Sequence, residues 1–352
     1  MEIVGADTPQ VALVVTTING PNAVLKELAA GCGRQDWRFF VIGDKKGPRE
    51  FACDGAEFYS LQRQIETDFA YARFCPTGHY ARKNVGYLLA VAGGSNVIVE
   101  TDDDNMPLPS FWAPRARLTN AARYRGSGWV NIYRYFTDAT IWPRGLPLDA
   151  VHGESAAHAS LAQEWVDVPI QQGLANDNPD VDAVYRLIMP LPQTFRADRA
   201  IALGSGAWCP FNSQNTSWWL EAFPLLYLPA YCSFRMTDIW RSFVAQRVAW
   251  ECGWSILFHG PTMAQDRNEH DLMKDFADEV PGYLNNQKIK KLLDEVELMP
   301  GASAISENML RCYRVLSANE LVSAEEVPLL QSWLNDLETA TRLGSAQRIL
   351  QA

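Results

Sequence analysis

The sequence predicts an α/β protein in which a mostly parallel β-sheet is flanked by helices and followed by a helical C-terminal extension. Three observations support this prediction. Short apolar runs rich in β-branched residues alternate with helical patterns in the N-terminal part of the chain. Gly, Pro, Asn and Asp bound these runs, and such residues commonly end strands. Beyond residue 238, apolar residues recur at the spacing of amphipathic helices.

The N-terminal strands are expected to be buried. Residues 11–17 form an uninterrupted apolar and β-branched run that stops before Asn19-Gly20-Pro21. A continuous run of this kind is typical of a parallel strand that is covered on both faces. By the same pattern, further strands are predicted at residues 37–43, at Phe58 and Tyr59, and at residues 96–101.

Helices are predicted between and after these strands, which implies a sheet with right-handed crossovers. The first should end at Gly31, and another should end at the C-cap pair Gly93-Gly94. The region 110–234 is dense in Trp, Pro, Asn and Gly, and we expect irregular structure there over an active-site face. Helical patterns occur at residues 22–30, 82–92, 284–298, 305–317 and 324–350.

The composition excludes several classes of protein. The chain has 352 residues, of which 47% are hydrophobic and 20% charged, as expected of a globular protein with a sizeable core. Its formal net charge of −10 argues against duplex nucleic acid as a partner, because phosphate neutralisation needs a basic surface. Seven Cys without a C-x-x-C pair predict reduced thiols. No run is long enough for a signal peptide or a membrane span, so we expect a soluble, cytoplasmic protein.

The clearest chemical signal is Asp102-Asp103-Asp104-Asn105, directly after a predicted strand. Adjacent carboxylates repel one another, so clustering them is unfavourable unless a cation compensates. In an extended chain Asp102 and Asp104 point to one side and Asp103 to the other. Two carboxylates on one side suit Mg²⁺ or Mn²⁺, which would neutralise a diphosphate leaving group. The alternative is a solvated acidic turn that caps the following segment.

Two further groups of residues predict a nucleotide site. Cations are unfavourable at the start of a helix, so the basic pair there predicts a bound phosphate, with a pair of surface bases as the alternative. Short polar side chains follow neighbouring strands, whose carboxyl ends meet at one edge of the sheet, and they are expected to bind a base and ribose. The pair is Arg82 and Lys83, and the polar group is Thr16, Thr17, Asn19 and Asp44.

Several residues keep two interpretations. Asp238 either caps the helix that follows it or removes the proton from an acceptor hydroxyl. His259 or His270 would complete a metal site, although a single His is more often structural. The polar run 211–216 and the tryptophans near it suggest carbohydrate contacts, with a core role as the alternative for Trp218 and Trp219. Asp180 and Asp182 form either a second polar site or a turn, and Trp208 is the tryptophan we favour for carbohydrate.

Taken in order, a series of blocks resembles the STELLO family of glycosyltransferase-like proteins, over roughly residues 10–270. The resemblance implies a GT-A-like, Rossmann-like domain that binds a nucleotide sugar, which we place at residues 1–270. The helical pattern places a C-terminal region at residues 271–352, packed on this domain or beside it. The matching blocks are residues 14–19, 43–46, 80–87, 100–105, 180–186, 211–216 and 235–241.

The resemblance also implies roles for the acidic block, which is similar to the DXD motif of nucleotide-sugar enzymes. Asp102 would contact the ribose or the metal, and Asp104 would bind the metal. Asp103 is grouped with the residues that bind the donor, although extended-chain geometry turns it away. The predicted cofactor is Mn²⁺ or Mg²⁺.

Outside this block, the resemblance places Arg82 and Lys83 near the diphosphate and Asp44 near the base. Asp238 occupies the position of a catalytic acid or base at the start of an acceptor-side helix. His259 is kept as a candidate third metal ligand on the strength of its position alone.

Together these features predict a metal-dependent glycosyltransferase that moves a sugar from a nucleotide diphosphate, UDP by family likeness, to a carbohydrate or other hydroxyl acceptor. A homodimer is an open alternative to a monomer. Other functions that the sequence allows are a nucleotide-sugar mutase and a catalytically degenerate domain that serves as a scaffold or binder. A phosphatase with an Asp nucleophile is disfavoured, because Asn105-Met106 occupy positions where Thr or Val is expected.

Overall fold

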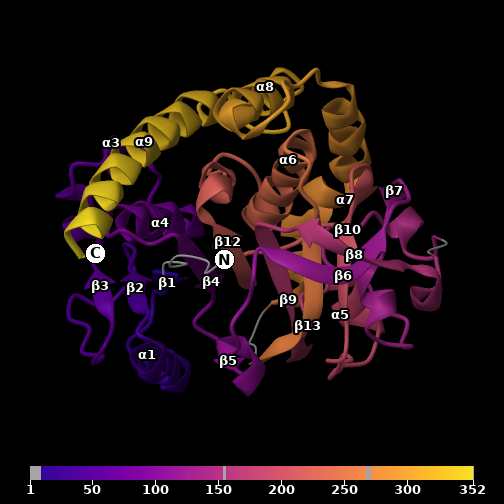
Figure 1. The fold of residues 1–352 in the computed structure, drawn as a ribbon, viewed down its shortest axis with the longest axis horizontal. Coiled ribbons are helices and arrows are strands. Elements are labelled where there is room, and N and C mark those ends of the chain that lie inside the picture. Colours follow the sequence, from indigo (N-terminus) through magenta and orange to yellow (C-terminus); the bar gives the residue numbers. More distant parts are fainter. Residues whose placement is uncertain (1–8, 154–155, 267–270, 352) are drawn as a thin grey trace, which may run out of the picture.

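One mixed sheet of eleven strands runs through the molecule in this computed structural model, which describes residues 9–153, 156–266 and 271–351 (Figure 1). Its N-terminal part is parallel, in the strand order β3-β2-β1-β4. The strands are β1 (Val11–Thr16), β2 (Arg38–Ile42), β3 (Glu57–Tyr59) and β4 (Val97–Thr101). All four were predicted, and the predicted α/β class is confirmed.

Beyond β4 the sheet continues as β12-β9-β13-β10-β6-β8, with parallel and antiparallel pairs mixed, while β5 pairs with β13. The region 110–234 therefore adds strands to the sheet that the sequence did not predict, although long stretches between them have no regular structure, as expected. The added strands are β5 (Asn105–Pro107), β6 (Leu118–Tyr124), β8 (Ala162–Asp167), β9 (Ile170–Asp177), β10 (Ala200–Leu203), β12 (Asn215–Trp219) and β13 (Ile256–Gln265). A separate ribbon consists of β7 (Gly128–Trp129) and β11 (Ala207–Trp208).

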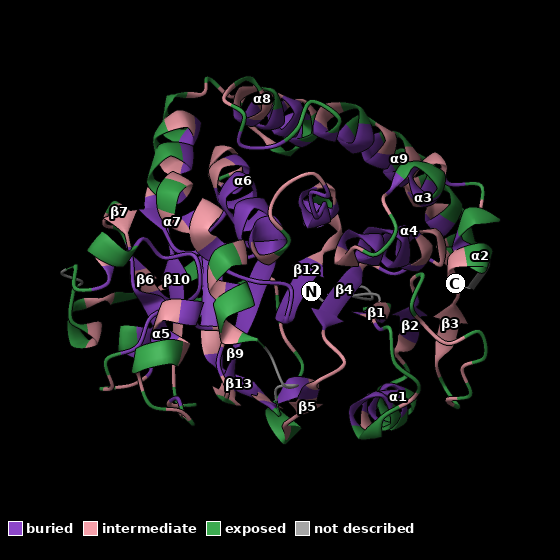
Figure 2. Ribbon diagram, turned by 180° about the vertical axis from the view of Figure 1, so that it is seen from behind, coloured by how far each residue is buried: buried purple, intermediate pink, exposed green. Residues whose placement is uncertain are grey.

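Helices cover both faces of the parallel part, and β1 shows why. Its side chains alternate, so that Ala12 and Val14 join the core beneath α4 (Lys83–Ala92), while Leu13 and Val15 join the core beneath α1 (Ala23–Gln35). The two helices lie on opposite faces in both ribbon views, and the strands between them are buried (Figures 1 and 2). Period-two alternation thus divides one apolar strand between two cores.

Helix α1 continues past Gly31, where the sequence predicted its end. The Trp112 ring occupies the space beside this glycine, and a Cβ added there would lie 2.0 Å from the ring. The glycine therefore allows close packing inside the helix rather than ending it. At the other terminus, the Asn22 side chain accepts a hydrogen bond from Leu25 N at 2.8 Å and caps the helix.

The C-terminal helices form an arch over one side of the sheet, drawn in orange and yellow in Figure 1. We call α7 (Leu272–Glu295), α8 (Ile305–Ala318) and α9 (Glu326–Gln351) the C-terminal arch. Helix α9 packs on α4 and on α3 (Ala70–Phe74), so the helices predicted for this region are present and cover the N-terminal part of the fold. The remaining α-helices of the described chain are α2 (Leu61–Ile65), α5 (Ala183–Ile188) and α6 (Thr237–Glu251).

The buried Glu326 at the start of α9 anchors the arch. Its carboxylate accepts hydrogen bonds from the Tyr227 hydroxyl and from Tyr231 N at 2.6 Å. Trp333, also in α9, is fully buried among aromatic rings that include Tyr71. Within the described parts of the chain, no helix is long and apolar enough to cross a membrane.

Candidate functional site

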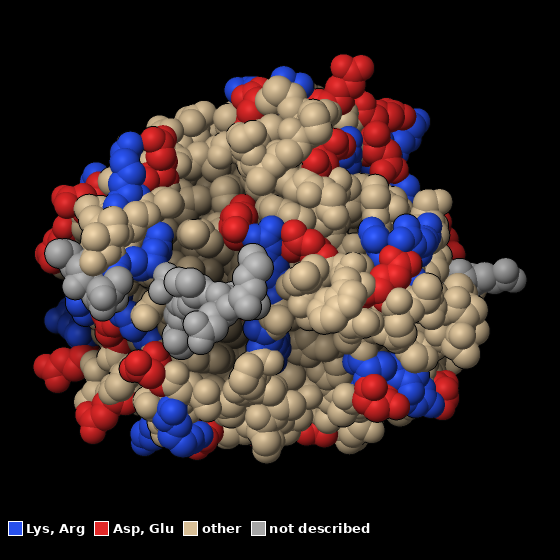
Figure 3. Space-filling view, viewed as in Figure 1, with Lys and Arg blue, Asp and Glu red and all other residues tan. Residues whose placement is uncertain are grey.

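A cavity of about 500 Å³ lies where β1, β2 and β4 end. It brings together most of the residues that the sequence predicted for the site. Those that line it are Thr16, Thr17, Asn19, Asp44, Arg82, Asp102, Asp103, Asp104 and Asp238. On the face shown in Figure 3, acidic and basic side chains gather in small mixed groups.

The acidic block forms the floor of the cavity. Strand β4 ends at Thr101, the chain then turns, and all three carboxylates line the cavity. Asp103 Oδ2 accepts hydrogen bonds from Thr17 Oγ1 at 2.6 Å and from Asn19 Nδ2 at 3.3 Å. The expectation that Asp103 points away was wrong, because alternation holds for an extended strand and these residues form a turn.

Lys83 forms an ion pair with Asp102 from the buried side of the acidic block. Its buried ammonium donates to Asp102 Oδ1 at 2.8 Å, to Thr101 O at 2.9 Å and to Ser213 O at 3.3 Å. These contacts use the three N–H donors of a lysine, and Lys83 does not line the cavity. Burial raises the pKa of Asp102, and the neighbouring Lys83 limits that rise. This geometry makes Lys83 a partner of the acidic block rather than of a diphosphate.

Arg82 is also held by the protein. It is 1% exposed, and its guanidinium donates to Gln64 Oε1 at 2.7 Å, to Cys75 O at 2.9 Å and to Ala72 O at 3.0 Å. The predicted helix start is correct, since α4 begins at Lys83. The guanidinium nevertheless fixes the chain around Ala72 and Cys75, and a phosphate contact would have to compete with these carbonyl groups.

Asp44 shapes the turn after β2. Its Oδ1 accepts from Lys45 N at 2.7 Å and its Oδ2 from His79 N at 2.9 Å, while its carbonyl accepts from Gly47 N at 2.7 Å. Asp44 thus ties two segments together at the rim of the cavity. Its predicted contact with a base stays a prediction.

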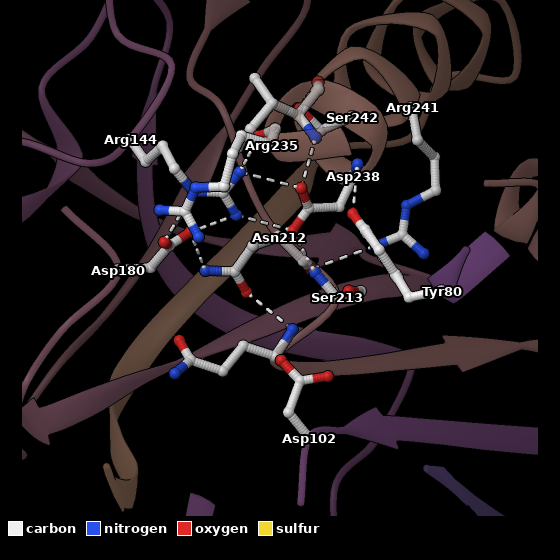
Figure 4. A network of polar contacts seen from close by, with 12 residues as sticks. Tyr80, Asp102, Arg144, Asp180, Asn212, Ser213, Arg235, Asp238, Arg241 and Ser242 are labelled. Atoms are coloured by element: carbon white, nitrogen blue, oxygen red, sulfur yellow. Dashed lines mark hydrogen bonds and ion pairs between the residues drawn. The ribbon is translucent and has the colours of Figure 1, made fainter. Parts of the chain in front are cut away.

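Arg144 organises the opposite wall of the cavity (Figure 4). The side chain, 7% exposed, donates to Asp180 Oδ1 at 2.8 Å and Oδ2 at 3.0 Å, and to Asp238 Oδ1 at 3.1 Å and Oδ2 at 2.9 Å. Asn212 Nδ2 donates to Asp180 Oδ2 at 2.7 Å. One guanidinium therefore pairs with two carboxylates that face the cavity. We call Arg144, Asp180 and Asp238 the arginine wall.

Asp238 is the second residue of α6, and Met236 occupies the N-cap position, so the capping interpretation was wrong. Its carboxylate also accepts from Ser213 N at 3.2 Å, and its own N–H donates to the Tyr80 hydroxyl at 2.9 Å. Burial opposes ionisation of Asp238, but the Arg144 guanidinium outweighs it and holds the pKa below its ordinary value. A carboxylate so occupied is a weak base, and the geometry favours a positioning role.

His259 is too far away to complete a metal site. It lies within β13 opposite Ala200 and does not line the cavity. Strand β13 reaches the acidic block only at Gln265, which is six residues further on and therefore roughly 20 Å away at the rise of a strand. Burial also lowers the pKa of His259 to about 3, which keeps the ring neutral. His270 lies outside the described residues.

Gln265 is a site residue that the sequence did not reveal. Its Nε2 donates to Asp104 Oδ2 at 3.0 Å. Its Oε1 is buried and has no hydrogen-bond partner within the described parts of the chain. A buried oxygen of this kind favours a ligand that supplies a positive charge or a donor. Neither Gln265 nor Arg144 belongs to a recognisable local pattern.

The oxygen donors of the acidic block fit a divalent cation. Carboxylate and amide oxygens suit Mg²⁺ and Mn²⁺. In the residues that the structure describes, no group of three or more His, Cys, Asp or Glu forms a ready-made cage. Such cages are unusual for Mg²⁺, which is commonly held by one or two carboxylates together with substrate phosphates. The donor set therefore fits an ion shared between the protein and a phosphate ligand.

Three aromatic side chains complete the rim. The His79 and Tyr80 rings stack with centroids 5.8 Å apart, and Phe234 meets Tyr80 edge-on at 5.1 Å. Phe234 is 48% exposed, and all three residues line the cavity. An exposed ring beside a polar cavity offers a surface for a base or for the apolar face of a sugar.

Two other predicted contacts are not at the cavity. Trp208 is fully buried in the core, where its Nε1 donates to Asp294 at 3.1 Å, so its predicted carbohydrate contact was wrong. Asp182 is the N-cap of α5 and accepts a hydrogen bond from Tyr185 N at 2.7 Å, a role that neither interpretation of the sequence gave it. From the polar run 211–216, Ser213 and Gln214 line the cavity.

Comparison with known proteins agrees with the predicted resemblance. Residues 235–344 match the model of a family described as STELLO glycosyltransferases, a span that begins just before α6 and includes most of the C-terminal arch. The chain is 29% identical to Probable glycosyltransferase STELLO2 and 28% identical to Probable glycosyltransferase STELLO1, both of Arabidopsis thaliana. Each alignment covers 92% of this chain but 44% of the relative, so the chain spans less than half the length of these relatives. The comparisons thus confirm the resemblance to the STELLO glycosyltransferases that the sequence predicted.

Proposed function

We propose that the chain is a metal-dependent glycosyltransferase that moves a sugar from a nucleoside diphosphate, UDP by family likeness, to a hydroxyl acceptor. The observation that supports this best is the meeting of three carboxylates with the ends of β1 and β2 in one cavity of about 500 Å³. Small-molecule sites commonly measure about 300–1,000 Å³, so a nucleotide sugar suits the space. The carboxyl ends of parallel strands are also where such folds bind nucleotides.

In this proposal Asp102 and Asp104 hold Mn²⁺ or Mg²⁺, whose charge stabilises the diphosphate as it leaves. Lys83 pairs with Asp102 and favours its ionised form, and Gln265 orients Asp104. Thr17 and Asn19 turn Asp103 toward the nucleotide end of the cavity. These partners are held by neighbouring strands and are in place before any ligand arrives, which favours accurate positioning.

The acceptor is proposed to bind between the arginine wall and Phe234. Arg144 fixes both carboxylates of that wall, and Asp238 ties it to Tyr80 and Ser213. The exposed Phe234 ring would stack on an acceptor sugar. The wall then orients the acceptor hydroxyl toward the donor without shifting when the acceptor binds.

Thermal unfolding in the presence of nucleoside diphosphates, with and without Mn²⁺, tests the proposal directly. A ligand that binds the folded chain raises its unfolding temperature by mass action. We expect UDP to act in the presence of Mn²⁺ and EDTA to abolish the effect, with UDP-sugar hydrolysis following the same dependence. Tight binding without turnover over a panel of donors and acceptors would indicate a binder instead, and isomerised donor without free UDP would indicate a mutase.

A further inference from the structure

We propose that Lys46 neutralises the phosphate groups of the bound nucleotide, a role that the sequence suggested for Arg82 and Lys83. The inference rests on the proposed function, because it assigns the phosphate partner within the same cavity. The basic side chains around that cavity differ in how many protein partners they have. Among the described residues, the basic side chains that line it are Lys46, Arg82, Arg144 and Arg235.

Three of these four cations are already occupied. Arg82 donates to protein oxygens from each of its nitrogen atoms. Arg144 is shared between two carboxylates of the arginine wall. Arg235 pairs with the buried Glu279 of α7 at 2.8 Å. Within the described chain, Lys46 makes no ion pair or side-chain hydrogen bond, and its side chain is exposed at the cavity.

The turn after β2 directs Lys46 to the cavity. Asp44 closes this turn by accepting hydrogen bonds from Lys45 N and Gly47 N, both at 2.7 Å. The bond from His79 N to the Asp44 carboxylate joins the turn to a second segment that lines the cavity. Both lysines are exposed, but Lys46 lines the cavity and its neighbour Lys45 does not. Adjacent lysines thus occupy two different environments.

The charges around the cavity require such a cation. Asp44 and the three carboxylates of the acidic block line the same cavity as Lys46, and they would repel a diphosphate. A divalent cation on the acidic block would offset part of that repulsion. A lysine ammonium on a flexible stem can follow a phosphate as it binds and leaves, unlike the buried guanidiniums. Lys46 therefore supplies positive charge on the side where β1 and β2 end.

The test compares Lys46→Ala with Lys45→Ala, which removes the same charge one residue away. Dissociation constants for UDP, inorganic pyrophosphate and uridine are measured by calorimetry at fixed Mn²⁺. We expect Lys46→Ala to weaken UDP and pyrophosphate about tenfold, as for loss of one charge-assisted contact, and to leave uridine unchanged. The dissociation constants of Lys45→Ala should stay within about twofold of the wild type, since an exposed charge that does not line the cavity is screened by solvent and salt. Lys46→Arg should restore most of the affinity for both phosphate ligands.

Equal effects of the two alanine variants would overturn the inference. A second result would also overturn it: Lys46→Ala binds Mn²⁺ more tightly, while the ratio of the dissociation constants for UDP and uridine stays unchanged. Lys46 would then affect only the binding of the metal to the acidic block. If the wild type binds none of the three ligands with Mn²⁺, the proposed function itself fails. Circular dichroism of each variant confirms that the fold is intact.

Discussion

The two sides of the cavity hold their carboxylates in different ways. On the nucleotide side, the Asp103 carboxylate accepts hydrogen bonds from the neutral hydroxyl of Thr17 and the amide of Asn19. On the acceptor side, Asp180 and Asp238 share the buried guanidinium of Arg144. The first arrangement gives Asp103 no cation of the protein, whereas in the second both carboxylates are paired with a cation before any ligand binds. The difference suggests that one side is built to bind a metal and the other to hold its shape.

Of the changes proposed for the two sides, removal of the shared Arg144 guanidinium should have the largest effect on the free energy of unfolding. Arg144→Met leaves two buried carboxylates without their cation, and breaking a buried ion pair in this way costs about 3–5 kcal/mol. Urea unfolding should show this loss of free energy of unfolding. Arg125→Met, which removes an exposed guanidinium paired with Glu164, is the control and should change stability by less than about 1 kcal/mol. Similar values for the two variants would contradict a preassembled wall.

Asp104→Asn should abolish function on the other side with little effect on stability. Because Asp104 is proposed to hold the metal, Mn²⁺-dependent donor hydrolysis should fall at least about a hundredfold. The free energy of unfolding should change by less than about 1 kcal/mol, since substitutions outside the core are usually mild. Asp266→Asn alters an exposed carboxylate just beyond β13 and serves as the control for turnover. Full activity of Asp104→Asn, or activity that survives EDTA, would remove the metal from the proposal.

Thr17→Val tests how far the neutral donors prepare the acidic block. The change keeps the size of the side chain but removes the hydroxyl that donates to Asp103 at 2.6 Å. Loss of one such partner should weaken Mn²⁺ binding about tenfold and lower the free energy of unfolding by about 1 kcal/mol. Titration with Mn²⁺ in the presence of UDP measures the first effect. Thr119→Val on β6 is the control, and an equal change in Mn²⁺ affinity there would contradict the assignment.

The strands that the sequence predicted differ in composition from those that it did not predict. Strands β1, β2 and β4 were found because their runs are apolar and β-branched, which is typical of strands buried on both faces. Strand β12 begins with polar residues and β9 contains buried glutamines, so their burial depends on hydrogen bonds between distant segments. Strand β13 contains Gly260-Pro261 and irregular register on both sides of the proline, which hides it from pattern analysis.

The sequence predicted those site residues that belong to a local sequence pattern. The acidic block follows a strand, so its position could be read from the chain. The roles of Arg82 and Lys83 could not, because burial turned both toward protein oxygens that come from other segments. Arg144 and Gln265 reach the cavity from a loop and from the end of β13, where no local spacing marks them. Charge alone did not show which cations remain available to a ligand.

The smallest expected effects are in the pH dependence of stability, which should differ between Asp238 on the acceptor side and Asp102 on the nucleotide side. The lowered pKa of Asp238 means that its ionised form stabilises the fold above the unfolded value of about 3.9, and that this contribution is lost only as pH falls further. The difference in unfolding free energy between the wild type and Asp238→Asn should therefore change by less than about 0.5 kcal/mol from pH 7 to pH 5. The raised pKa of Asp102 has the opposite sign, so the wild type should lose stability relative to Asp102→Asn as pH rises above about 4. Urea titrations of the three proteins at each pH measure both slopes. A flat difference for Asp102 would mean that Lys83 compensates its burial fully, and a sloping difference for Asp238 would mean that Arg144 does not control that carboxylate.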